Sequence, residues 1–159
     1  MKVLLLLAAV VAIGQAHLCL VFPKQRGNIT GLNMAGADNC LLVKDAPCGG
    51  RPAEMPEVTF ESGMNATIIF QKNLDHWVMA TPGMFEINLW GMKGKMNLMT
   101  VPDMGPNMGQ PSGTLYTVSV PMPKMEMEKA ILQVVYITKN PMAPAMFYQC
   151  ADVNVMMKR

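Results

Sequence analysis

The chain has 159 residues and a formal net charge of +2, with 51% apolar residues and 15% charged ones. This size is typical of one domain with a substantial buried core. The nearly balanced charge, and the lack of any basic run in the sequence, argue against a protein that binds nucleic acid.

The first 16 residues have the layout of a secretory signal peptide. Lys2 supplies a positive charge, residues 3–13 form an apolar stretch, and Gly14 and Ala16 place small residues three and one before a cut after position 16. The apolar stretch is shorter than the roughly 20 residues that a membrane-spanning helix needs. We therefore expect a secreted, extracellular protein with no transmembrane segment, in which residues 17–159 form a single domain.

A cut after Ala16 makes His17 the first residue of the mature protein. It would then offer one metal ion two nitrogen ligands, the free α-amine and a ring nitrogen. The chain contains one other histidine, His76, which can supply a third nitrogen in a T-shaped set. This histidine brace suits Cu(II), because that ion favours nitrogen ligands in a planar arrangement. A cut after Gly14 is the alternative, and it would remove the α-amine from the site and favour a structural domain without metal.

Cysteines and glycosylation sequons both fit the secretory pathway. Four cysteines in a secreted chain predict two disulfides, with three pairings open, and no C-x₂-C spacing supports a zinc site. Two N-x-[ST] sequons predict surface glycosylation. The residues concerned are Cys19, Cys40, Cys48 and Cys150 for the disulfides, and Asn28 and Asn65 for the glycans.

The body of the chain has the pattern of an all-β protein. Apolar and polar residues alternate in several short segments, and Gly and Pro occupy the gaps between them. One run, residues 131–137, is almost continuously apolar and β-branched, which is typical of a central strand covered on both faces. Residues 125–132 alternatively allow a turn or two of helix. We predict a β-sandwich with strands near residues 67–70, 85–89, 116–120, 131–137 and 148–157.

Methionine is unusually frequent, with 18 residues in the chain. They crowd two stretches, residues 92–108 and 122–127. Methionine is an adaptable filler of hydrophobic cores, and we favour this interpretation. Thioethers also bind Cu(I), because soft ligands prefer the reduced ion, so a second copper site is the alternative.

Three segments resemble the fungal copper-binding proteins related to lytic polysaccharide monooxygenases (LPMOs). Residues 17–27 (HLCLVFPKQRG) are similar to the mature start of those proteins, a histidine followed by a strand that ends in an aromatic–proline pair. Residues 46–50 (APCGG) and 148–153 (YQCADV) are similar to two later segments of the family. The three segments occur in the family's order and span most of the domain.

The resemblance implies an immunoglobulin-like (fibronectin-like) β-sandwich and a copper site made of two histidines and an aspartate. On this chain those ligands would be His17, His76 and Asp152, with Asp75 as the competing carboxylate. The fungal relatives with an aspartate ligand are associated with copper acquisition and are not known as polysaccharide oxidases.

The predicted function is therefore extracellular copper capture, transport or homeostasis through one bound Cu(II). The predicted partners are the copper ion and a membrane copper transporter. The alternative is a copper-dependent polysaccharide monooxygenase acting on chitin or a similar polysaccharide. That enzyme needs a flat face bearing aromatic side chains, whereas most aromatic residues here fall in strand positions with a buried pattern.

Overall fold

A computed structural model describes residues 17–158 of the chain, which form eight strands and two short 3₁₀ turns, with no α-helix in that range. The predicted signal peptide, residues 1–16, lies outside the described residues. The elements are β1 (His17–Phe22), η1 (Asp38–Cys40), β2 (Val58–Glu61), β3 (Asn65–Leu74), β4 (Met84–Gly91), β5 (Gly94–Pro102), η2 (Pro106–Met108), β6 (Thr114–Pro121), β7 (Met127–Ile137) and β8 (Met146–Met156).

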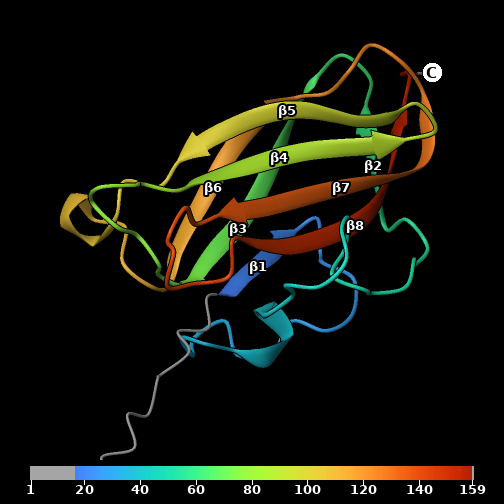
Figure 1. The fold of residues 1–159 in the computed structure, drawn as a ribbon. Helices are drawn as coiled ribbons and strands as arrows, with labels where there is room; N and C mark the ends of the chain where they lie inside the picture. Colours follow the sequence, from blue (N-terminus) through green and yellow to red (C-terminus); the bar gives the residue numbers. More distant parts are fainter. Residues whose placement is uncertain (1–16, 159) are drawn as a thin grey trace, which may run out of the picture.

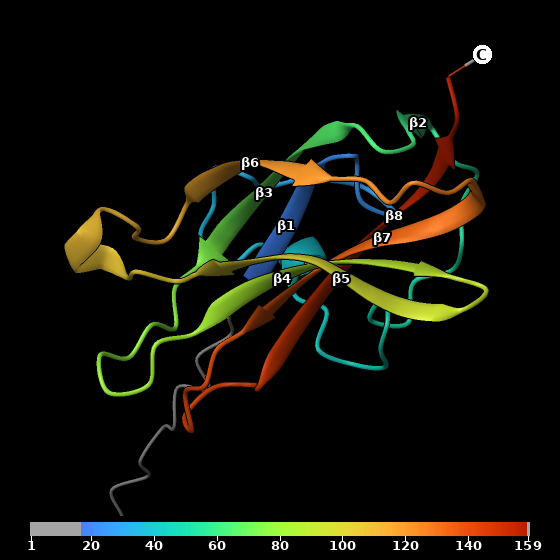
Figure 2. The same ribbon diagram turned by 90° about the horizontal axis from the view of Figure 1, so that it is seen from above.

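The strands form two sheets that pack face to face. One sheet has the order β1-β3-β6 and the other β2-β8-β7-β4-β5. Neighbouring strands are antiparallel except β2 and β8, which run parallel. Figures 1 and 2 show the three-stranded sheet as one layer and the five-stranded sheet as the other. The predicted all-β sandwich is confirmed.

The core lies between the sheets because each strand directs alternate side chains inward. Phe70 of β3 stacks on Tyr116 of β6, with ring centroids 4.9 Å apart, and Phe85 of β4 contacts both rings from the opposite sheet. Strand β7 lies between β4 and β8, and its residues 132–136 are all buried, as its apolar run predicts. This aromatic cluster joins the two sheets.

All five predicted strands occur, and most extend beyond the predicted limits. The suggested helical turn over residues 125–132 is wrong, because Met127 begins β7 and pairs with Val155 of β8. Strand β1 corresponds to the strand that the family resemblance implied after His17, whereas strands β2 and β5 were not predicted. Both are edge strands. Strand β5 is largely exposed and lacks regular alternation, whereas β2 alternates apolar and polar residues but is only four residues long.

The structure confirms two disulfides and selects their pairing, Cys19–Cys40 and Cys48–Cys150. The first joins β1 to η1, and the second joins the segment before β2 to β8.

Asn28 and Asn65 are both exposed, so glycosylation at either is sterically open and stays a prediction. Within residues 17–158 no helix is long and apolar enough to cross a membrane.

Candidate metal centre

Pairing of β1 with β3 brings the two histidines together. His17 is the first residue of β1 and lies opposite Leu74, the last residue of β3. His76 follows two residues later, at the same end of the sandwich. The two side chains are close enough for the charge of His17 to act on the pKa of His76. The prediction that these residues share a site is therefore compatible with the fold.

The His76 ring favours the neutral form that binds metals. Burial lowers its pKa below the ordinary value of 6.5; nearby Asp75 opposes this shift, and His17 adds to it. Its Nε2 atom is buried and has no hydrogen-bond partner among residues 17–158. A buried ring nitrogen without a hydrogen-bond partner, beside a second imidazole, is a donor set that suits copper.

Three neighbours fix the position of His76. Its ring stacks on Phe147 of β8, with centroids 6.0 Å apart. Asn140 Nδ2 donates a hydrogen bond to the backbone oxygen of His76 at 3.1 Å, and the backbone N–H of His76 donates to the Tyr136 hydroxyl at 3.4 Å. The loop that carries His76 is thereby attached to the ends of both β7 and β8.

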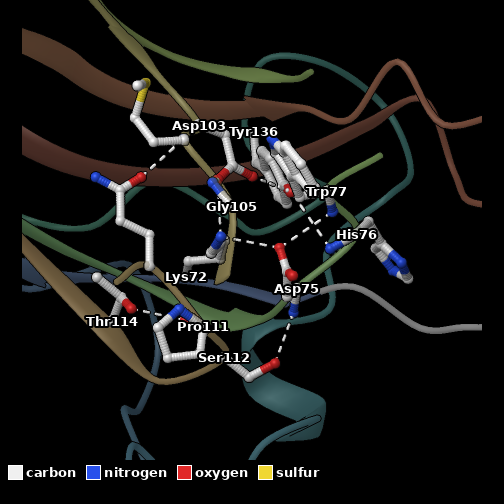
Figure 3. A network of polar contacts seen from close by, with 12 residues as sticks. Lys72, Asp75, His76, Trp77, Asp103, Gly105, Pro111, Ser112, Thr114 and Tyr136 are labelled. Carbon is white, nitrogen blue, oxygen red and sulfur yellow. Dashed lines mark hydrogen bonds and ion pairs between the residues drawn. The ribbon is translucent and has the colours of Figure 1, made fainter. Parts of the chain in front are cut away.

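A buried ionic network lies on the other side of this loop (Figure 3). The ammonium group of Lys72, which has no exposed area, is 2.7 Å from Asp103 Oδ1 and 2.8 Å from Asp75 Oδ1. The Tyr136 hydroxyl donates to Asp103 Oδ2 at 2.6 Å. Burial, and then this hydrogen bond, raise the pKa of Tyr136 well above its usual range, so the hydroxyl remains a donor. The network connects β3, β7 and the loop after β5 to the backbone of His76.

Asp75, the competing carboxylate, is directed into this network and away from the His76 ring (Figure 3). Its Oδ1 accepts hydrogen bonds from Lys72 Nζ and from the backbone N–H of Trp77, at 2.8 and 3.0 Å. The indole of Trp77 packs against Gly105, where a Cβ atom would lie 2.3 Å from the ring. Any other residue at position 105 would therefore displace Trp77 and the loop beside His76.

Asp152 lies in a separate ion pair. Arg26 Nε and Nη2 each donate to one of its carboxylate oxygens at 2.7 Å, and the backbone N–H of Glu54 donates at 2.9 Å. Both side chains of the pair are almost completely buried. The structure does not bring Asp152 to the histidines: among residues 17–158, no three His, Cys, Asp or Glu side chains lie together as a metal-binding group.

A loop covers His17 and accounts for its burial, since only 1% of the residue is exposed. The backbone N–H groups of Gly36 and Ala37 donate to Asn73 Oδ1 at 2.8 and 3.0 Å. A Cβ atom at Gly36 would lie 3.8 Å from the His17 ring. The disulfide of Cys40 with Cys19 then holds the end of this loop on β1.

Sequence patterns did not identify the residues that support the histidines. Lys72, Asp103, Tyr136 and Phe147 come from different strands and loops, and no spacing relates them. One weak signal exists: Lys72 follows an apolar strand segment, and its position in β3 gives it two buried neighbours, Gln71 and Asn73. A charged residue in such a segment needs a partner, but the sequence does not say which.

A family profile described as "Copper acquisition factor BIM1-like" matches residues 15–159. No curated protein matches the chain in sequence. A solved polysaccharide monooxygenase, CBM33, studied by X-ray photoreduction, aligns with a TM-score of 0.53 and 11% identity, over 88% of this chain and 100% of that chain. An LPMO from Kitasatospora papulosa aligns with a TM-score of 0.43 and 12% identity, over 79% and 71% of the two chains. The CBM33 likeness shows a shared fold.

Proposed function

Because this chain belongs to the family of BIM1-like copper acquisition factors, we propose that it captures extracellular copper by binding one Cu(II) ion between His17 and His76. The observation that carries the proposal is the meeting of the only two histidines of the chain at one end of the sandwich. The buried, unpartnered Nε2 of His76 supports it.

The ligands would be three nitrogens: the α-amine and ring of His17, and the ring of His76. Such a set holds Cu(II) in a planar geometry. The α-amine becomes available only if secretion removes residues 1–16, so the proposal includes the predicted signal peptide and extracellular location. Phe147 orients the His76 ring, and the Lys72 network holds the loop from which that ring projects.

We do not include Asp152 among the proposed ligands. Both of its oxygens accept hydrogen bonds from Arg26, so ligation by Asp152 would compete with a buried ion pair. Removing one partner of such a pair costs about 3–5 kcal/mol. We therefore propose that the aspartate suggested by the family resemblance holds Arg26 in this chain, and that the metal ligands come from the two histidines.

Oxidation of a polysaccharide is the alternative function. It needs an aromatic surface near the copper to hold the substrate. Among the large apolar side chains exposed on residues 17–158, Phe22 is the single aromatic one, and it lies at the other end of β1 from His17. Incubation of copper-loaded protein with chitin and a reductant tests this alternative. Oxidised oligosaccharides in excess of a free-copper control would overturn the proposal of copper capture and identify the protein as an enzyme.

A Cu(II) titration of the secreted, mass-verified protein tests copper capture directly. Two variants accompany it, one with an extra alanine before His17 and one carrying His76→Ala. We expect tight one-to-one binding that both changes weaken strongly, and electron paramagnetic resonance spectra in which both variants lose the nitrogen-ligand pattern of the wild-type protein. Equal binding in all three proteins would overturn the proposal. A membrane copper transporter as the recipient of the ion stays a prediction.

A further inference from the structure

Most of the methionines lie outside the core, contrary to our interpretation of them as core filler. Residues 17–158 contain 17 methionines, and twelve of them are exposed. The main core cluster has twenty buried residues, of which Met122 is the single methionine. Exposed thioethers contribute little to packing, so adaptable filling of the hydrophobic core does not explain their position.

Two exposed methionines lie on the loops that flank His76. Met79 follows His76 by three residues, and Met142 lies on the connection between β7 and β8. Their exposed fractions are 73% and 78%. Both side chains are long, unbranched and surrounded by solvent, so they can reorient without disturbing any packed group.

Hydrogen bonds hold these two loops together. Thr81 Oγ1 donates to the backbone oxygen of Lys139 at 2.8 Å. Asn140 donates through Nδ2 to the backbone oxygen of His76 and accepts, at Oδ1, the backbone N–H of Met142 at 2.8 Å. The chain segments bearing Met79 and Met142 are thus connected to each other and to His76.

We propose that Met79 and Met142 form a Cu(I) site beside the histidine pair. A thioether is a soft ligand that selects Cu(I), whereas imidazole and amine nitrogens in a plane favour Cu(II). The inference extends the proposed copper capture: the protein would receive the reduced ion on its thioethers and the oxidised ion on its histidines. The two sites share one end of the molecule but have no proposed ligand in common.

The chain provides a matched control at the opposite end of the sandwich. Met64 and Met125 are 55% and 38% exposed and lie on two loops that are also hydrogen-bonded, through Met122 N–H to Met64 O and Gly63 N–H to Pro123 O, at 2.9 and 3.2 Å. No histidine of the described chain lies there. A double Met→Leu substitution at these positions removes the same number of exposed thioethers.

The experiment compares three secreted, mass-verified proteins: wild type, Met79→Leu/Met142→Leu and Met64→Leu/Met125→Leu. Cu(I) affinity is measured without oxygen by competition with a chromophoric Cu(I) chelator, and Cu(II) affinity by titration in air. We expect the first double variant alone to lose about tenfold or more in Cu(I) affinity. We also expect it to lose the sulfur signal in the X-ray absorption spectrum of the bound Cu(I). Cu(II) affinity should be the same in all three proteins.

Unchanged Cu(I) affinity in the Met79/Met142 variant, or an equal loss in both double variants, would overturn the inference. Equal loss would mean that exposed methionines bind Cu(I) without regard to position. A wild-type protein that fails to bind Cu(II) would contradict the proposed function. The Cu(I) site would still stand if the two double variants differed as expected.

Discussion

Arg26 and Asp152 are 126 residues apart in the chain and form a buried ion pair through two hydrogen bonds of 2.7 Å each. The backbone N–H of Arg26 also donates to the backbone oxygen of Cys150, at 2.7 Å. These contacts attach the segment after β1, in the three-stranded sheet, to β8 of the other sheet. Asp152 thus connects the two layers of the sandwich.

Substituting Asp152→Asn should reduce stability far more than copper affinity. The change leaves Arg26 buried without its counter-charge, at a cost of about 3–5 kcal/mol. Chemical denaturation measures the loss, with Glu57→Gln as a control, because its ion pair with Lys24 is exposed and worth at most about 1 kcal/mol. A folded Asp152→Asn protein with Cu(II) affinity as weak as that of His76→Ala would instead identify Asp152 as a ligand.

Substituting Asp103→Asn should weaken the copper site from a distance. The change removes the carboxylate charge of Asp103, to which both Lys72 and Tyr136 donate hydrogen bonds. Tyr136 in turn contacts the backbone of His76. Loss of such supporting contacts commonly costs about 10–100-fold in metal affinity. Electron paramagnetic resonance of the Cu(II) form should show a broader distribution of geometries.

A graded comparison uses Tyr136→Phe, which keeps the aromatic ring and removes the hydroxyl alone. Its effects on stability and on the Cu(II) spectrum should have the same direction as those of Asp103→Asn and a smaller size, since one hydrogen bond to a charged group contributes about 1.5–3 kcal/mol. If both variants retained the wild-type spectrum while losing stability, the network would support the fold without positioning His76.

Acidification should destabilise the copper-free protein partly through His76. Because burial lowers the pKa of His76 in the folded state below its ordinary 6.5, the unfolded chain takes up the proton first. The contribution is therefore complete above that value and is lost as the pH falls below it. The unfolding temperature should therefore fall less steeply with decreasing pH in His76→Gln than in the wild-type protein. An equal pH dependence in the two proteins would contradict the assignment.

Copper binding should have its own pH dependence. The ring nitrogens and the α-amine bind the metal only when deprotonated, so Cu(II) affinity should fall as the solution becomes acidic. Titrations at a series of pH values measure this effect. Affinity that is constant down to about pH 5 would indicate carboxylate or thioether ligands instead.

Removing the Cys19–Cys40 disulfide should uncover His17. The bond closes the loop that passes over the His17 ring, with a sequence separation of 21 residues. A Cys19→Ser/Cys40→Ser protein should lose about 3 kcal/mol of stability. Its backbone amides at Gly36 and Ala37, which bond to Asn73, should exchange hydrogen faster. Unchanged exchange at these two amides would show that Asn73 alone holds the loop.

Local pattern was sufficient to predict a β-sandwich and five of its eight strands. Alternation in residues 85–89 and 116–120, and the apolar run of residues 131–137, predicted strands because a sheet with one or two buried faces imposes those periods on its sequence. The number of cysteines predicted two disulfides, and the scarcity of histidine identified His17 and His76 as the candidate pair. Each of these inferences depends on residue types or on neighbours within a few positions.

The tertiary structure decided everything that depends on partners distant in the chain. It paired Cys19 with Cys40, joined Asp152 to Arg26 instead of to the histidines, and enclosed Lys72 between two carboxylates. It also placed most methionines on the surface, although their hydropathy predicts burial. Composition and spacing describe what a side chain prefers; which partner satisfies a buried charge depends on which strands meet, and only the assembled sheets specify that.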